Sequence, residues 1–360
     1  MALALTPGIG ASRLHALLES FGSADGALSA PFAFLCRVPG ISRACATAIR
    51  GTTPDHGGDI LARVESLGAT VLLPGDPAFP PVLADIPEPP QLLFALGRPD
   101  LLTLPAVAIV GSRDHSAYGA ECCRLIAAQA ARSGLAVVSG MARGLDAVAH
   151  HAALDAGGAT IGVLGNGLGV IYPAANRALY EQVQRDGLLL TEFAPGERPH
   201  LGSFPRRNRL ISGLARVTVV VEAARGSGTM RTVEAALEQG RDVMAVPGPI
   251  TSVTSEGTNR LIRDGAEPLL ETADLLRHYE ELVEVGKGGS GEGVAQFELP
   301  VSLSEFEARV ATTLGGDSAI ADDLALRLSQ PVGAVLDALS GLELAGVVEA
   351  VAGGRFRRRG

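Results

Sequence analysis

The stretch Val107-Ala-Ile-Val-Gly-Ser-Arg113 decides the fold, because four apolar residues run without interruption into a glycine-containing turn. Similar β-rich runs follow at LAVVSG (135–140), TIGVLG (160–165), LLLTEF (188–193), VTVVVEA (217–223) and DVMAVPG (242–248). Strands that are apolar throughout and alternate with helical stretches are typical of a parallel sheet covered on both faces. We therefore predict an α/β fold for residues 71–284. It is a Rossmann-like, doubly wound parallel sheet, whose ligand lies beyond the carboxyl ends of the strands.

A small helical domain is predicted before the sheet, over residues 1–70. It holds a degenerate repeat, TPGIG (6–10) and VPGIS (38–42), and each copy precedes a helical stretch. Each copy resembles half of a helix-hairpin-helix, in which a glycine permits a tight turn and free amides at the next helix start can face a phosphate. A packing module that touches no DNA has the same pattern, and both interpretations stay open.

Two linkers and a C-terminal domain complete the predicted organisation. Many prolines between Pro74 and Pro105 indicate an extended segment that leads into the sheet domain. A flexible linker is predicted at 285–299, and residues 300–360 are predicted to form a winged-helix domain from two consecutive helices and the hairpin VVEAVAGGRFRRR. The second of these helices, 332–344, offers no arginine, so we do not expect it to read a major groove. The arginine-rich end is either a solvated tail or a nonspecific phosphate contact.

Composition limits the classes of function. A net charge of −9 argues weakly against nucleic-acid binding, so any DNA site must be a focused patch. Lys287 is the only lysine, so arginine supplies the positive charge. The four cysteines show neither a CxxC pair nor zinc-ligand spacing, which indicates reduced thiols and no metal site. No long unbroken apolar stretch and no secretory signal stand out, so we expect a cytoplasmic protein without a membrane span.

Candidate ligand-binding residues gather after the first three strands. The first strand is followed by Gly111-Ser112-Arg113, and no glycine stands at the spacing of a dinucleotide-binding GxGxxG motif. A helix start, a hydroxyl and a guanidinium there suit a nucleic-acid phosphate, although an ordinary turn with a surface arginine is the alternative. The next two strand ends add backbone amides and a second arginine to the same edge, through Ser139, Gly140, Arg143, Asn166 and Gly167.

The segment FPRRNR combines three arginines with an aromatic ring that we expect to be exposed. Arginines neutralise phosphates and an exposed ring stacks on bases, which is the pairing that proteins use for single strands. Stacking is worth about 1–3 kcal/mol per base, enough with a few phosphate contacts to overcome an unfavourable net charge. In the alternative, the ring packs inward at a helix start and some arginines pair with Glu192, Glu197 or Glu222. The candidates here are Phe204, Arg206, Arg207, Asn208 and Arg209.

Two further features complete the candidate site. Ser227, Gly228 and Thr229 follow the fifth strand and open another helix with hydroxyls and glycine amides that suit an anion. Asp146 and His150 are four residues apart on a helix, so they are close enough to pair or to share a metal. We favour structural pairing, because two ligands alone make no metal site.

Six motifs, in this order and spacing, resemble the DNA-processing protein A (Smf) family. They are VAIVGSR, SGMARGLDAVAHHAAL, TIGVLGNGLGVIYP, FPRRNRLISGLA, VVVEAARGSGT and GRDVMAVPG. The resemblance covers about residues 73–270, and the flanking helical and winged-helix modules also occur in that family. It implies a dimeric bacterial protein that binds single-stranded DNA without sequence preference and loads the RecA recombinase onto it during natural transformation. It implies no catalytic activity and no cofactor.

Carried over by position, the Gly111-Ser112-Arg113 turn matches the family's first DNA-contacting loop, and the FPRRNR segment matches its FPxRNR loop. The chain departs from the family after Thr229. The family usually continues with Ile-Thr-Ala, whereas this chain has Met230-Arg-Thr-Val233, so Arg231 either adds a phosphate contact or alters local packing. Some relatives use lysine near the DNA, where this chain can offer only arginine.

Two other classes of function share features with this sequence. Lysine-decarboxylase-like phosphoribohydrolases share the fold class, but Thr232 stands where their motif requires a glutamate, and Glu234 lies two residues further on a different helix face. Without that carboxylate the loop offers no general acid or base. A winged-helix transcription regulator is the third interpretation, and the acidic recognition helix argues against it.

Overall fold

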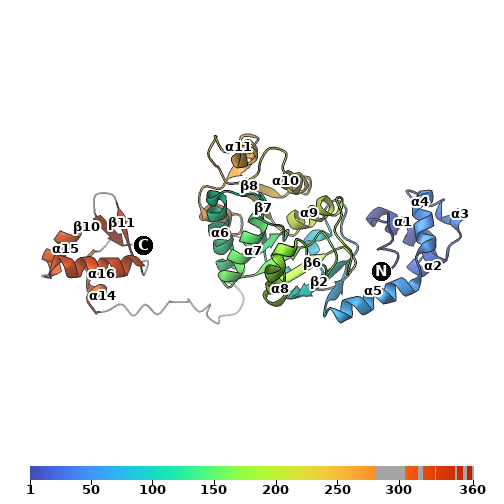
Figure 1. Ribbon diagram of the computed structural model, residues 1–360, viewed down its shortest axis with the longest axis horizontal. Helices are drawn as coiled ribbons and strands as arrows, with labels where there is room; N and C mark the ends of the chain where they lie inside the picture. Colours follow the sequence, from blue (N-terminus) through green and yellow to red (C-terminus); the bar gives the residue numbers. More distant parts are fainter. Residues whose placement is uncertain (281–304, 315–318, 329, 345–346, 352–354, 359–360) are drawn as a thin grey trace. The chain divides into compact units, whose positions relative to one another are not determined.

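The fold is described from a computed structural model of the chain (Figure 1). The structure describes residues 1–280, 305–314, 319–328, 330–344, 347–351 and 355–358, and the linker predicted at 285–299 lies outside them. The chain divides into two compact units, Met1–Gly288 and Gly289–Gly360, and each is described by itself.

Four short helices open the first unit and enclose a small core of their own. They are α1 (Ala11–Phe21), α2 (Ala24–Ser29), α3 (Phe32–Leu35) and α4 (Arg43–Gly51). Local signals fix their ends: Ser23 and Ser42 accept amide hydrogen bonds as N-caps, and Gly22 ends α1 in a left-handed conformation. The next helix, α5 (Pro54–Ser66), packs instead against the sheet, because Ile60 and Val64 are buried with Phe94 and Leu189.

Nine strands form one sheet in the order β1-β2-β6-β5-β4-β3-β7-β8-β9. The seven strands from β6 to β9 in this order pair in parallel, whereas β2 is antiparallel to both β1 and β6. From β3 the chain moves outward through β4, β5 and β6, and it then returns to the other side of β3 for β7, β8 and β9. This is the doubly wound sheet that the sequence predicts, so the fold class is confirmed. The strands are β1 (Thr70–Leu72), β2 (Leu93–Gly97), β3 (Ala106–Val110), β4 (Ala136–Ser139), β5 (Thr160–Val163), β6 (Leu188–Thr191), β7 (Val217–Val220), β8 (Asp242–Ala245) and β9 (Glu267–Pro268).

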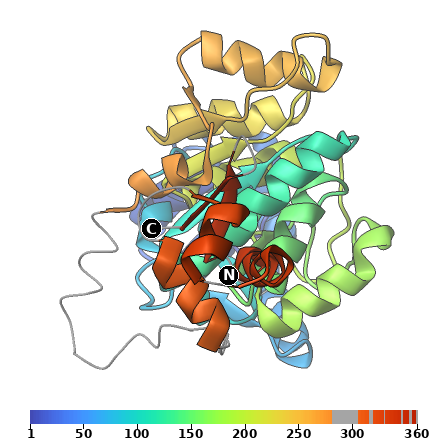
Figure 2. The ribbon, with the colours of Figure 1, turned by 90° about the vertical axis from the view of Figure 1, so that its left-hand side faces the viewer.

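Helices cover both faces of this sheet (Figures 1 and 2). Alternate side chains of β3 point to opposite faces, so Ala108 belongs to one core cluster and Val107 to the other. The first face packs against α9 (Ser203–Gly213), α10 (Thr229–Glu238) and α11 (Glu256–Arg263). The second packs against α6 (Ala117–Arg132), α7 (Leu145–Asp155) and α12 (Thr272–Arg277), while α8 (Arg177–Asp186) covers β2 and β6. Short 3-10 helices lie at Pro81–Leu83, Pro99–Thr103, Ala174–Asn176 and Val253–Ser255.

The proline-rich segment corrects one prediction. Residues between Pro74 and Pro105 are not only a link to the sheet, because β2 is one of its strands and pairs with β6. Phe79, Leu83 and Ile86 are buried in the core of the first face. Burying such side chains contributes about 1.5–3 kcal/mol each, so this segment stabilises the domain that it leads into.

The second unit agrees with the predicted winged helix: it has the two predicted helices and the paired strands β11 and β12, and it adds a helix before them that was not predicted. Its elements are α14 (Glu305–Leu314), β10 (Ala319–Ile320), α15 (Ala321–Leu328), α16 (Val332–Leu344), β11 (Val348–Val351) and β12 (Arg355–Arg358). The strands pair in the order β10-β12-β11, and the helices pack beside them around a core that includes Val310, Leu324 and Leu339. Figures 1 and 2 draw this unit in orange to red.

Candidate nucleic-acid interface

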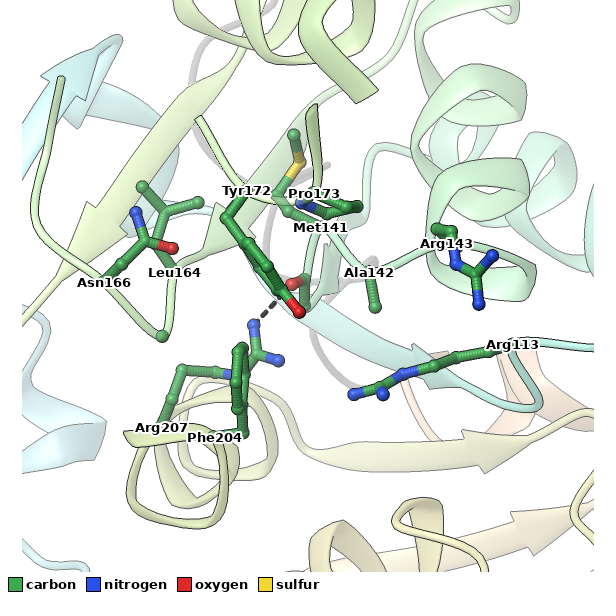
Figure 3. Close-up of a pocket in the computed structure, with 12 residues that line it drawn as sticks. Arg113, Met141, Ala142, Arg143, Leu164, Asn166, Tyr172, Pro173, Phe204 and Arg207 are labelled. Atoms are coloured by element: carbon green, nitrogen blue, oxygen red, sulfur yellow. Dashed lines mark hydrogen bonds between the residues drawn. The ribbon is translucent and has the colours of Figure 1, made fainter. Parts of the chain in front are cut away.

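The carboxyl ends of β3, β4 and β5 border a pocket of about 210 Å³, which α9 closes from the other side (Figure 3). Twelve residues line it: Arg113, Gly140, Met141, Ala142, Arg143, Leu164, Gly165, Asn166, Tyr172, Pro173, Phe204 and Arg207. Six of them belong to the candidate site predicted from the sequence, although they come from four separate segments of the chain. The pocket lies at the predicted edge of the sheet, and no aspartate or glutamate lines it.

Arg113 and Arg143 are the exposed cations of this pocket. Within the described part of the chain neither makes an ion pair. The loops that carry them touch: Leu145 donates its amide to the Ser112 carbonyl at 3.1 Å, and a Cβ on Gly144 would lie 2.4 Å from that oxygen. Gly144 also has φ +80°, a conformation that L side chains rarely adopt. The glycine therefore keeps the two arginine-bearing loops together, and Figure 3 shows Arg113 directed into the pocket.

An aromatic wall faces these cations. The rings of Tyr172 and Phe204 lie with centroids 5.5 Å apart and planes tilted by 39°. Gly165 makes room for the wall, because a Cβ there would lie 2.9 Å from the Phe204 ring. Phe204 is half-buried rather than exposed as predicted, whereas Tyr172 is 47% exposed. Sequence reasoning quoted the IYP motif but missed Tyr172 as a site residue, since nothing local relates it to Phe204.

Arg207 corrects the prediction of a surface phosphate contact. Its side chain is only 5% exposed, and its Nη1 donates to the carbonyls of Gly140 and Val163. Burial lowers the pKa of Arg207 to about 10, and the charge of Asp146 opposes that shift. One edge of the guanidinium faces the pocket in Figure 3, while the rest joins α9 to the ends of β4 and β5. Arg207 is thus part of the pocket floor.

The turn after β4 corrects the expectation of free anion-binding amides. The amides of Gly140 and Ala142 donate to Asp146 Oδ2 at 3.1 and 3.3 Å, so the chain's own carboxylate occupies them. Burial raises the pKa of Asp146, and Arg207 opposes that shift. Gly140 lies between this pair, since a Cβ there would be 2.7 Å from both the guanidinium and the carboxylate. These two amides are therefore not available to an anion.

The hydrogen-bond donors after β3 are likewise occupied by a carboxylate of the chain itself. Ser116 donates its amide at 2.9 Å and its hydroxyl at 2.6 Å to Glu222, a buried residue at the end of β7. The start of α6 is thus neutralised internally, which corrects the predicted phosphate cradle at this helix start. Ser112 is likewise engaged, because its hydroxyl bonds to the backbone of Asp114. Of the Gly111-Ser112-Arg113 turn, the Arg113 side chain remains available to a ligand.

The other two arginines of FPRRNR agree in part with the alternative interpretation, in which they pair with carboxylates. Arg209 pairs with Glu192 at 2.7 Å, and the exposed Arg206 lies 3.8 Å from the same carboxylate and 5.3 Å from the centre of the Phe193 ring. Asn208 accepts a hydrogen bond from Arg207 Nε at 3.2 Å. The three arginines therefore do not form one exposed cluster, and Arg206 is the one exposed among them.

Several other predicted residues hold the edge in shape. Ser139 is fully buried and donates to the Ile109 carbonyl, and the buried Asn166 donates to the carbonyls of Gly167 and Val170. A Cβ on Gly167 would lie 1.8 Å from the Ala194 oxygen, so this glycine permits a close backbone contact. None of these groups presents a free donor to the pocket in the way the sequence suggested.

Asp146 and His150 do not pair with each other, contrary to the sequence interpretation. Asp146 bonds to the turn after β4, and His150 Nδ1 lies 2.7 Å from the Thr160 hydroxyl. His150 is fully buried, and this burial lowers its pKa to about 3. Asp146 therefore has its partners in the turn after β4, and His150 has its partner at the start of β5.

The turn at Ser227, Gly228 and Thr229 lies at the start of α10, outside the pocket. Thr229 donates its hydroxyl to the Gly111 carbonyl at 3.1 Å, which ties this turn to the end of β3. Arg231 is exposed and lies 3.3 Å from Glu234, so its departure from the family pattern creates a surface ion pair. Such a pair contributes little to stability.

Comparison with known proteins gives the family. The family model of DNA recombination-mediator protein A matches residues 70–280, which is more than half of the chain. The chain belongs to this family. The DprA winged helix domain also matches residues 298–354, in agreement with the fold of the second unit.

Relatives within the family are close in sequence and in structure. DNA processing protein DprA of Streptococcus pneumoniae is 45% identical over 205 residues, which are 57% of this chain and 72% of that protein. Its X-ray structure matches with a TM-score of 0.67 and 35% identity over 77% of this chain and 95% of that chain. DNA processing protein A from Helicobacter pylori, whose structure describes a single-stranded DNA binding mode, matches with a TM-score of 0.54 and 28% identity over 60% and 96% of the two chains.

In the described part of the chain, no helix combines the length and the apolar character that crossing a bilayer requires. Nor do three or more His, Cys, Asp or Glu side chains gather there in a way that could hold a metal ion. The four cysteines are free thiols.

Proposed function

We propose that this protein binds single-stranded DNA at the pocket between β3, β4, β5 and α9, without sequence preference. The observation that carries the proposal is the convergence of Arg113, Arg143 and one edge of Arg207 on a pocket walled by Tyr172 and Phe204. Guanidiniums neutralise phosphates of any sequence, and a ring face stacks on any base. A duplex keeps its bases stacked inside, so an unpaired strand is the ligand that offers a phosphate and a free base face to one pocket.

The charge distribution supports an anionic ligand here. The whole chain carries a formal charge of −9, yet the pocket has three guanidiniums and no acidic lining residue. The nearby carboxylates, Asp146 and Glu222, are occupied by backbone or hydroxyl donors. A polyanion approaching this edge therefore meets positive potential although the protein as a whole repels it. The Helicobacter pylori relative, whose structure concerns a single-stranded DNA binding mode, supports the same ligand class.

As a recombination mediator, the protein is further proposed to act as a homodimer and to load RecA onto the strand that it holds during natural transformation. The support is its membership of the DNA recombination-mediator family and its similarity to DNA processing proteins. RecA assembly on an oligothymidylate, followed by RecA's DNA-dependent ATP hydrolysis, tests this part. We expect the intact protein to accelerate assembly, whereas an unchanged rate would reject RecA loading without touching the DNA-binding proposal.

The binding proposal is tested by fluorescence anisotropy of a labelled oligothymidylate over a series of salt concentrations. The joint change Arg113→Ala and Arg143→Ala should weaken binding and lower the slope of log affinity against log salt by about 1.4, because each lost phosphate contact removes about 0.7 on a single strand. Arg124→Ala with Arg263→Ala is the matched control, since both residues are exposed and paired with carboxylates away from the pocket. An unchanged slope in the first variant, or an equal change in the control, would reject the site.

A further inference from the structure

The two copies of the N-terminal repeat fold alike. Each contains a left-handed glycine, Gly8 at φ +81° and Gly40 at φ +79°. In each copy the isoleucine after this glycine is buried and donates its amide to the carbonyl three residues before it, at 3.0 and 3.1 Å. A helix then begins three residues after each glycine, α1 after the first and α4 after the second. The repeat is therefore a duplicated turn-and-helix unit.

The two copies also contact each other reciprocally. A Cβ on Gly8 would lie 3.1 Å from Cys45 Sγ, and a Cβ on Gly40 would lie 3.8 Å from Arg13 Cγ. Cys45 is the fifth residue after Gly40, and Arg13 is the fifth residue after Gly8, so both contacts join equivalent positions of the two copies. Such reciprocity is what two units related by an approximate two-fold axis produce. The starts of α1 and α4 consequently lie side by side.

This segment has a positive net charge, unlike the chain as a whole, because residues 6–50 hold four arginines against Glu19 and Asp25. The four arginines are all exposed: Arg13, Arg37, Arg43 and Arg50. No ion pair joins any of them to another residue of the described part of the chain, and neither α1 nor α4 has an acidic residue in its first turn. Three of them surround the second turn. Arg37 stands three residues before Gly40 and Arg43 three residues after it, and Arg13 packs against this glycine.

Aromatic rings accompany these cations. The guanidinium of Arg37 lies 5.3 Å from the centre of the Phe34 ring, and that of Arg43 lies 5.8 Å from the centre of the Phe32 ring. Phe34 is 53% exposed although α1 to α4 have a core of their own that could bury it. Unpaired guanidiniums resting on accessible rings are typical of nucleic-acid surfaces.

We propose that this paired turn, residues 6–50, is a second nucleic-acid site and that it binds the phosphate backbones of duplex DNA. The two strands of a duplex are related by local two-fold axes, so a two-fold surface can meet equivalent phosphates on both strands. A single strand has no such symmetry. These residues would therefore bind duplex DNA next to the single-stranded segment that binds at the sheet edge. Of the two interpretations that the sequence leaves open for the repeat, this proposal takes the one in which it contacts DNA.

The test measures duplex and single-strand affinity of the full chain over the same salt series. Arg13→Ala, Arg37→Ala and Arg43→Ala together should lower the duplex slope by about 2.7, since each phosphate contact contributes about 0.9 on duplex DNA. The single-strand slope should stay unchanged. Arg124→Ala, Arg185→Ala and Arg263→Ala form the matched control, because they remove the same charge from exposed, ion-paired positions elsewhere.

Arg13 also donates to the Gly8 carbonyl at 2.6 Å, so its loss could loosen the turn itself. The double change Arg37→Ala and Arg43→Ala avoids that contact and should still lower the duplex slope, by about 1.8. A wild-type protein without duplex affinity, or variants that keep the duplex slope, would overturn the proposal. Loss of single-strand affinity in the Arg113 and Arg143 variant, with duplex affinity kept, separates this site from the sheet edge.

Discussion

Replacing Arg207 tests whether the pocket floor is structural, because the sequence alone assigns this arginine to a DNA phosphate. The change Arg207→Met removes the charge and keeps most of the side-chain volume. It takes the donor from the carbonyls of Gly140 and Val163, and it leaves Asp146 as a buried carboxylate without its cation. Leaving a buried acceptor without its donor costs about 1–3 kcal/mol, and here two carbonyls lose their donor while Asp146 loses a nearby positive charge. We expect a loss of about 2–5 kcal/mol, moderated because two amides still donate to Asp146.

The assay is urea unfolding of the full chain, following the transition of the sheet-containing unit. Arg206→Met is the matched control, because Arg206 is the exposed neighbour and its weak pair with Glu192 is worth about 0–1 kcal/mol. Adding Asp146→Asn to Arg207→Met should recover part of the loss, since the asparagine oxygen can still accept the backbone amides without a buried charge. A loss below about 1 kcal/mol for Arg207→Met would refute the structural role of Arg207 and favour the surface phosphate contact that the sequence predicts.

Three further outcomes are expected. Burial lowers the pKa of His150 to about 3, so below about pH 6.5 the unfolded chain binds a proton at this residue and the folded chain does not. From pH 7 to pH 5 the unfolding free energy of wild type should therefore fall by about 2 kcal/mol more than that of His150→Gln. Equal pH dependence of the two proteins would contradict this burial. Tyr172→Ala should lower single-strand affinity by about 1–3 kcal/mol while Tyr172→Phe keeps it, and equal effects would mean that the ring does not stack. Incubation with nucleoside monophosphates should release no free base, because no carboxylate lines the pocket; sustained release would instead favour the phosphoribohydrolase interpretation.

The sheet could be predicted because its strands carry their signal locally. Runs such as VAIVG and VTVVVEA are apolar throughout, as strands buried on both faces must be, and the glycine-rich turns follow them directly. Strand β2 escaped prediction because it lies among prolines, and its burial depends on pairing with β6 rather than on its own sequence. The position of the site at the carboxyl ends followed from the topology.

The roles of individual arginines could not be predicted from sequence. Arg206 and Arg207 are neighbours of the same type, yet about 100° of helix rotation sends one to solvent and the other beneath the pocket. Arg207 can be buried because the carbonyls of Gly140 and Val163 accept its hydrogen bonds and the charge of Asp146 lies nearby, and all three partners are far away in the sequence. The spacing of Asp146 and His150 correctly places them on one helix. However, Asp146 bonds to the turn after β4 and His150 to Thr160, so the two do not pair with each other.

Photochemical cross-linking of an oligothymidylate that carries 5-iodouracil tests the central claim most directly, because this base reacts with the aromatic ring on which it stacks. Peptide mapping of the cross-linked full chain should place the bond at Tyr172 or Phe204, and the Arg113→Ala and Arg143→Ala variant should cross-link weakly. Cross-links confined to other rings, with both pocket rings unmodified, would contradict a single strand bound at this edge of the sheet.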